Sequence, residues 1–239
     1  MKRSEINSLI RHALDFTKAQ GFALPPLADW TPEEWAGKGH ECDEIRHNML
    51  GWDVTDYGLG RFSQVGLVLF TIRNGSQKDP ERYPKPYAEK ILISREDQVC
   101  PMHFHWYKRE DIINRGGGIL EMQLYNSLPD GELDREGDVR VVSDGVQLTI
   151  PAGTVLHLVP GQSVTLTPGL YHAFWARKGR GTVLIGEVSQ CNDDLTDNRF
   201  YEPMGRFPTV EEDEPPFRLL CSEYPTCHFE PSPHTGEKS

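Results

Sequence analysis

The sequence predicts an all-β domain, an antiparallel sandwich or barrel, preceded by a helical N-terminal segment. From about Val65 the chain consists of short runs rich in Val, Ile, Leu and Thr, among them GLVLFTIRNG, EKILISRE, GILEMQLYNS, VRVVSDGVQLTIPAG and GTVLIGEVSQ. Gly, Pro, Asp and Asn separate these runs, and no convincing helical pattern interrupts them. Many short strands with such punctuation are typical of sandwiches and barrels.

The first 21 residues predict an amphipathic helix. Ile6, Ile10 and Leu14 recur at helical spacing, Ser4 is a candidate N-cap, and Gly21 follows the last periodic residue. Further on, TPEE at 31–34 has the composition of a helix start. We therefore expect three regions: a helical wrap over 1–62, a β-barrel domain over 63–227, and a disordered tail over 228–239.

Composition and charge exclude several classes of function. The 239 residues carry a formal net charge of −11, which disfavours binding to phosphate backbones and anionic lipid. No run of about 20 apolar residues is present, and charged residues interrupt the N-terminal segment where a signal peptide would be apolar. The 5 cysteines include no CxxC pair, so we expect free thiols. A cytoplasmic location is the simplest expectation.

The stretch CPMHFHWYKRED, residues 100–111, predicts a metal site. Side chains two apart on a strand share a face, so His103 and His105 project to the same side, and Glu110 can return to the same ion after a turn. A further ligand has two candidates, His172 and His157. Imidazoles with one carboxylate and no thiolate suit a borderline divalent ion such as Mn²⁺, Fe²⁺, Co²⁺, Ni²⁺ or Zn²⁺.

These motifs resemble those of the cupin superfamily. His103, His105, Glu110 and Gly117 match its first motif, with Asp97 where a glycine is usual. The second motif is matched by Gly161, Gly169 and His172, whereas its proline is displaced to Pro168 and Ala176 replaces its asparagine. The resemblance implies a double-stranded β-helix, or jelly-roll, barrel, and its register selects His172 over His157 as the ligand.

The strand that follows the first motif has one polar face. Glu121, Gln123 and Tyr125 alternate with Leu120, Met122 and Leu124. If the polar face lines the barrel it suits a polyol, and Glu121 becomes a buried carboxylate with the character of a base. The alternative is that this face is the solvated outside of the sheet.

Two further places are candidates for substrate contacts. Lys90 precedes the metal-bearing strand, and a lysine there can bind a hydroxyl or stabilise an oxyanion. The charged segment CNDDLTDNRFYEPMGRFP has the composition of a loop that closes a barrel mouth. Its charged residues are Asp193, Asp194, Asp197, Arg199, Glu202 and Arg206.

Over nearly all of residues 1–227 the chain resembles the D-lyxose isomerases, a cupin-type branch of the sugar isomerases. The resemblance rests on GWDVTDYGLGRF, EKILISRE, CPMHFHWYKREDIINRGGG, LYNS and the ending VSQCNDDLTDNRF. It implies interconversion of D-lyxose with D-xylulose and of D-mannose with D-fructose, Mn²⁺ by preference with Co²⁺ as another candidate, and a homodimer. It also implies His103, His105, Glu110 and His172 as metal ligands, with Lys90 in contact with substrate.

For the reaction we expect proton transfer through a cis-enediol, with a metal-assisted hydride shift as the rival. Glu121 is the first candidate for the base, and Glu202 and Asp193 are the reserves. The expected sugar contacts are Lys90, His103, Glu110, Glu121 and Asp193. The competing interpretations are a ferrous cupin dioxygenase, a non-catalytic sugar-binding cupin, and an epimerase or phosphosugar isomerase.

Overall fold

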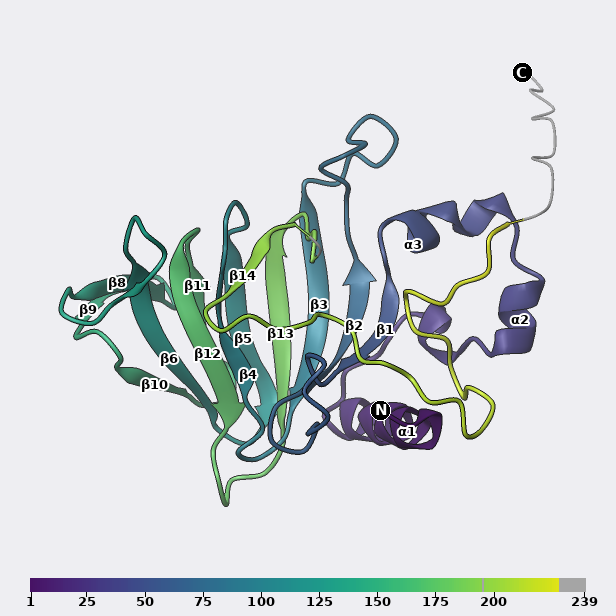
Figure 1. Ribbon diagram of the computed structural model, residues 1–239, viewed down its shortest axis with the longest axis horizontal. Helices are drawn as coiled ribbons and strands as arrows, with labels where there is room; N and C mark the ends of the chain where they lie inside the picture. The colour runs from purple at the N-terminus through teal and green to yellow at the C-terminus, as the bar shows by residue number, and fades with distance from the viewer. Residues whose placement is uncertain (195, 228–239) are drawn as a thin grey trace.

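The computed structural model describes residues 1–194 and 196–227, which form two facing antiparallel sheets with the helices gathered at one end (Figure 1). The helices are α1 (Arg3–Ala19), α2 (Pro32–Ala36) and α3 (Asp43–His47), with single 3₁₀ turns at Pro26–Asp29 and His40–Cys42. The predicted β-class is confirmed, and the curled sheets are those of a cupin barrel.

The larger sheet has the order β1-β2-β3-β13-β5-β11-β8-β9. Its strands are β1 (Gly51–Thr55), β2 (Leu67–Arg73), β3 (Tyr87–Ser94), β13 (Val183–Gln190), β5 (Glu110–Gly117), β11 (Ser163–Leu166), β8 (Val139–Ser143) and β9 (Val146–Ile150). The smaller sheet has the order β10-β6-β12-β4-β14, and a short strand β7 also pairs with β6. Its strands are β10 (Val155–Leu158), β6 (Leu120–Ser127), β12 (Leu170–Ala176), β4 (Cys100–His105), β14 (Asn198–Phe200) and β7 (Leu133–Asp134).

Alternation along the strands divides the apolar residues into two cores. On β3, Leu92 faces the space between the sheets, whereas Ile91 and Ile93 face the helical end. Because side chains alternate along a strand, Lys90 lies on the same side as Leu92. The same parity places Glu187 beside Ile185 on the inward face of β13. Charged groups are thereby carried into the barrel by strands that are otherwise apolar.

The N-terminal helix covers the outer face of the larger sheet. Ile6 and Ile10 of α1 are fully buried, and they pack with Trp52 and Phe70 of β1 and β2. Burying a large apolar side chain contributes about 1.5–3 kcal/mol, so this face fixes the helix on the sheet. The predicted helix is confirmed, but its N-cap is Lys2.

Two local expectations have different outcomes. Ser4 is not the N-cap, because it lies inside the helix and its hydroxyl donates to Asp213 at 2.7 Å. At α2 the predicted helix start is confirmed: Thr31 Oγ1 accepts from Glu34 N, and the Glu34 carboxylate accepts from Thr31 N, which forms a capping box.

The expected region boundaries differ from the structure in one respect. Strand β1 lies inside the segment 1–62, which we expected to be helical, and it forms the edge of the larger sheet. After β14 the chain runs back across the sheets to the helical end (Figure 1). The expected tail over 228–239 lies outside the described residues. In the part of the chain that the structure describes, no helix is long and apolar enough to cross a membrane.

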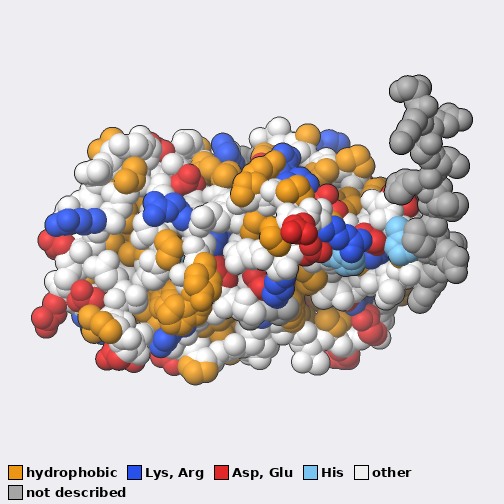
Figure 2. Space-filling view, turned by 90° about the horizontal axis from the view of Figure 1, so that it is seen from above, with side chains coloured by type: hydrophobic (Ala, Val, Ile, Leu, Met, Phe, Trp, Pro, Cys, Tyr) orange, Lys and Arg blue, Asp and Glu red, His pale blue; other side chains and the backbone are white. Residues whose placement is uncertain are grey.

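The surface carries both signs of charge. Figure 2 shows acidic and basic side chains interspersed with small hydrophobic patches on the face that it presents. On that face the described residues form no single broad basic patch.

Candidate functional site

Three histidines converge between the two sheets. His103 and His105 lie on β4, and His172 lies on the neighbouring strand β12 in register with His103. Each offers one ring nitrogen, and these three nitrogens all lie within 4.8 Å of one another. All three side chains are buried. His157, the competing ligand candidate, lies on edge strand β10 with its side chain 51% exposed.

Hydrogen bonds to main-chain carbonyls orient two of these rings. His103 Nδ1 lies 2.7 Å from the carbonyl oxygen of Pro101, and His172 Nδ1 lies 3.0 Å from that of Leu170. With Nδ1 bonded to a carbonyl, Nε2 keeps its lone pair for a metal ion. His105 Nδ1 is buried and has no partner among the described residues. Buried imidazoles held in this way suit a divalent ion.

Glu110 completes the cluster from the opposite sheet. Its Oε1 lies 3.3 Å from Nε2 of both His105 and His172, and its Oε2 lies 2.8 Å from Lys108 Nζ. Burial raises the pKa of Glu110, but the charge of Lys108 and the contacts with His105 and His172 together outweigh burial and hold that pKa well below its usual range. Burial and the neighbouring imidazoles lower the pKa of His103. A carboxylate anion thus faces three buried imidazoles, a donor set that fits a borderline divalent cation.

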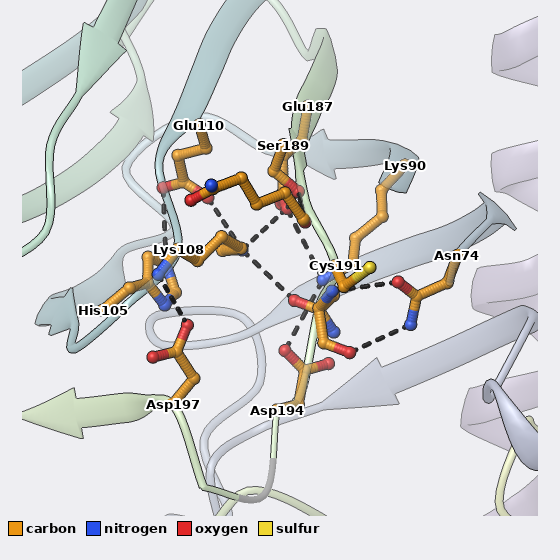
Figure 3. Close-up of polar contacts among 12 residues, drawn as sticks. Asn74, Lys90, His105, Lys108, Glu110, Glu187, Ser189, Cys191, Asp194 and Asp197 are labelled. Carbon is orange, nitrogen blue, oxygen red and sulfur yellow. Dashed lines mark hydrogen bonds and ion pairs between the residues drawn. The ribbon is translucent and has the colours of Figure 1, made fainter. Parts of the chain in front are cut away.

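A single ammonium group joins two carboxylates on the facing wall. Lys108 Nζ lies 2.8 Å from Glu110 Oε2, 2.8 Å from Glu187 Oε1 and 3.2 Å from Asn192 Oδ1 (Figure 3). Burial lowers the pKa of Lys108, but Glu110 and Glu187 more than offset this and raise it above its usual value. Ser189 also donates to Glu187 Oε1, at 3.2 Å. Lys108, Glu110 and Glu187 line one cavity together with the three histidines, whereas Ser189 and Asn192 do not border it.

A second cluster of charged side chains lies where β3 meets the segment after β13. Lys90 Nζ lies 3.5 Å from Asp194 Oδ1 and 3.7 Å from Glu187 Oε1. Arg206 Nη2 donates to Asp194 at 2.9 Å and to Asp53 at 2.7 Å. Burial raises the pKa of Asp194, but the charges of Lys90 and Arg206 hold it well below its usual range. Lys90, Asp194 and Arg206 all line the same cavity as the histidines.

The expected position of Glu121 is wrong. Leu120, Met122 and Leu124 fill the barrel, and Glu121 therefore projects from the outer face of β6. There its carboxylate contacts Trp175 Nε1 and His157 Nδ1, at 2.6 and 3.1 Å. Gln123 and Tyr125 share this outer face. The apolar residues occupy the interior because their burial stabilises the fold, whereas a buried carboxylate needs compensating partners.

The two reserve carboxylates also lie away from the cavity lining. Glu202 is exposed after β14. Asp193 pairs with Lys78 at 2.8 Å, and its neighbour Asp194 is the residue that reaches the cavity. Asp194, and not Asp193, is therefore the aspartate of this pair that lines the cavity.

Two central residues, Lys108 and Glu187, are not among those predicted from the sequence. Lys108 lies inside the quoted metal motif, two positions before Glu110. Glu187 is the one acidic residue in the apolar run VLIGEVSQ and has the parity of Ile185. An isolated charge at an inward position of a buried strand is the signal that was available for it.

Solved structures share this architecture at low sequence identity. The L-ribose isomerase of Cellulomonas parahominis with L-ribose matches with a TM-score of 0.53 and 16% identity, covering 84% of this chain and 92% of that one. The L-ribose isomerase of Acinetobacter sp. DL28 in complex with L-ribose matches with a TM-score of 0.55 and 14% identity, covering 87% and 98%. The fold and the buried cluster define a cupin-type protein with a candidate divalent metal site.

Sequence comparison gives the family. The family model described as D-lyxose isomerase matches residues 1–224. Relatives from Escherichia coli O157:H7 and Serratia proteamaculans, each named D-lyxose/D-mannose isomerase, are 48% identical over 225 residues, covering 94% of this chain and 98% of each relative. The chain belongs to the D-lyxose isomerase family, and it is an aldose–ketose isomerase.

Proposed function

We propose that the protein interconverts D-lyxose with D-xylulose and D-mannose with D-fructose. The names of relatives at 48% identity support these substrates. The observation that carries the chemistry is the pair of buried carboxylates, Glu110 and Glu187, bridged by Lys108 beside three imidazoles. D-lyxose and D-mannose have the same configuration at C2, C3 and C4, so one cavity can hold the reacting end of both.

In this proposal Glu187 moves the proton. It takes the proton from C2 of the open-chain aldose, which gives a cis-enediolate. The O2 hydroxyl proton then passes to O1, and Glu187 returns the first proton to C1, which gives the ketose. Glu110 is less suited, because its two oxygens already contact His105, His172 and Lys108. The contacts of Glu187 with Lys108, Ser189 and Lys90 all use Oε1, which leaves Oε2 for the substrate.

His103, His105, Glu110 and His172 are the proposed ligands of a divalent ion, Mn²⁺ by preference with Co²⁺ as an alternative. Such an ion supplies Lewis-acid polarisation of the sugar carbonyl. The buried cluster of three imidazoles and one anionic carboxylate supports this assignment. His103 and Glu110 would then also border the reacting end of the sugar.

The remaining charged groups are assigned to binding and to charge stabilisation. Lys108 and Lys90 both lie next to Glu187 and can stabilise negative charge that develops on O1 or O2. Asp194 and Arg206 line the cavity and offer an acceptor and a donor to the hydroxyls of the sugar tail. A homodimer, as the family resemblance implies, and a cytoplasmic location, which the sequence favours, complete the proposal. Sedimentation of the purified protein checks the dimer.

The test is a ketose assay with D-lyxose and D-mannose, with and without added Mn²⁺, on the wild type and on Glu187→Gln. We expect Glu187→Gln to retain bound metal and to lose about 10²–10⁴-fold in kcat, the usual contribution of a general base. A rate near that of the wild type would place the base elsewhere. Tritium at C2 separates the two routes, because proton transfer releases label to solvent and a hydride shift retains it.

A further inference from the structure

The carboxylate of Asp197 holds the turn that carries Lys108. One oxygen accepts from the N–H of Tyr107 at 2.8 Å, and the other accepts from the N–H of Lys108 at 3.1 Å. The main-chain oxygen of Asp197 also accepts from the N–H of Trp106, at 3.0 Å. Three consecutive amides of the turn between β4 and β5 therefore bind one residue, which Figure 3 places below Lys108 and His105.

Within the described residues, the hydrogen bonds of this carboxylate all go to the turn. Asp197 is 2% exposed, and within the described residues no lysine or arginine forms an ion pair with it. A buried carboxylate is costly unless hydrogen bonds compensate it, and here the compensation comes from the turn. The bonds to the two amides therefore fix the turn to the start of β14.

Lys108 needs a fixed backbone because its ammonium group has to reach acceptors on separate elements. Nζ contacts Glu110 at the start of β5, Glu187 on β13 and Asn192 beyond the end of β13. A lysine side chain loses up to about 2 kcal/mol of rotamer entropy when it is immobilised. If the backbone of the turn moved, the Lys108 ammonium group would therefore readily lose its contacts with these acceptors. Asp197 holds the backbone of Lys108, and the acceptors bind its ammonium group. The side chain then keeps the carboxylates of Glu110 and Glu187 in place.

We propose that Asp197 is a positioning residue for the isomerisation: by binding the amides of Tyr107 and Lys108 it sets the Lys108 ammonium group between Glu110 and Glu187. The inference rests on the proposed function and adds a residue that does not touch the substrate. Asp197→Asn leaves one acceptor oxygen and turns an NH₂ group toward the second amide. The turn then keeps two of its three hydrogen bonds to residue 197, the main-chain bond from Trp106 and one side-chain bond.

The test is a double-mutant cycle with Lys108→Met. In the wild-type background we expect Asp197→Asn to lower kcat by about 10- to 100-fold, because a displacement of about 1 Å at the reacting groups has effects of this size. KM should change by less than about threefold, and bound metal should stay constant. In the Lys108→Met background the same change should cost less than about twofold, since coupled residues are not additive. An equal loss in both backgrounds would overturn the inference.

The matched control is Asp134→Asn. Asp134 also accepts from two backbone amides, those of Glu136 and Gly137 at 3.1 and 2.8 Å, but in a turn that does not border the cavity. It should leave kcat unchanged.

A second measurement does not depend on turnover. Hydrogen exchange of the Tyr107 and Lys108 amides should accelerate in Asp197→Asn and stay at the wild-type rate in Asp134→Asn. Unchanged exchange in Asp197→Asn would overturn the inference by itself. Wild-type protein that makes no ketose from either sugar would refute the proposed function instead, and the exchange rates would still decide whether Asp197 holds the turn.

Discussion

Trp175 Nε1 donates a hydrogen bond to Glu121 Oε2 at 2.6 Å on the outer face of the smaller sheet. The two residues face each other across the β6–β12 pairing, on the side opposite His172 and Leu124. The carboxylate of Glu121 therefore lies on the opposite side of the smaller sheet from the cavity. Glu121, Gln123 and Tyr125 therefore do not supply the polar lining that suits a polyol. Charged groups on β3, β5 and β13 line the cavity instead.

We therefore predict that Glu121→Gln retains the wild-type kcat and KM for D-lyxose within about twofold. The amide can still accept from Trp175, so the free energy of unfolding should change by no more than about 1 kcal/mol. Steady-state kinetics and a denaturant titration check both expectations. A loss of turnover comparable to that of Glu187→Gln would mean that the outer face takes part in the reaction.

The histidine cluster gives a prediction about bound metal. His103→Ala or His172→Ala removes one of the three converging nitrogens, so each variant should lose most of its bound divalent ion on dialysis and its isomerase activity with it. The control is His157→Ala, whose ring is half exposed on the outer face. Metal content per chain by atomic absorption, together with the ketose assay, is the measurement. Full metal occupancy in His172→Ala would exclude that residue as a ligand.

Part of this site could be predicted because the signal is local. Two histidines at alternate positions of a strand must share a face. The approach of Glu110 also needs β5 in the larger sheet to face β4 in the smaller one. The same local patterns correctly gave the first helix and the Thr31 cap.

The errors arise where the answer depends on tertiary packing. The two faces of β6 are distinguishable in sequence, but which of them points inward depends on the facing sheet. Here Leu120, Met122 and Leu124 point inward. Similarly, Asp193 and Asp194 are neighbours of the same type, and only the positions of Lys90 and Arg206 select Asp194. Glu187 meets Lys108 from 79 residues away, a pairing that no local pattern contains.

Asp194 predicts a pH dependence of stability. Its pKa is depressed in the folded state, so it contributes stability that is fully present above the unfolded pKa of about 3.9 and is lost as pH falls toward the folded value. Asp194→Asn should be less stable than the wild type by about 1.5–3 kcal/mol at pH 7, the usual value of a charged hydrogen bond. The difference should shrink from about pH 5 downward. Thermal unfolding of both proteins between pH 3 and 7 measures it, and a constant difference across that range would contradict the assignment.

The contact between Arg3 and the C-terminal segment predicts a stability loss that leaves catalysis intact. The Arg3 guanidinium is 2% exposed and binds Glu212 at 2.6 Å and Glu223 at 2.5 Å, which ties α1 to the returning chain. Arg3→Met leaves both carboxylates without this partner, and we expect a loss of about 1–3 kcal/mol in the free energy of unfolding. Lys18→Met, an exposed change on the same helix, should cost less than about 0.5 kcal/mol. Urea titration measures both variants, and kcat at 25 °C should be unchanged in each, because neither residue lines the cavity. Equal stability of the two variants would mean that Arg3 does not fasten the helix to the chain end.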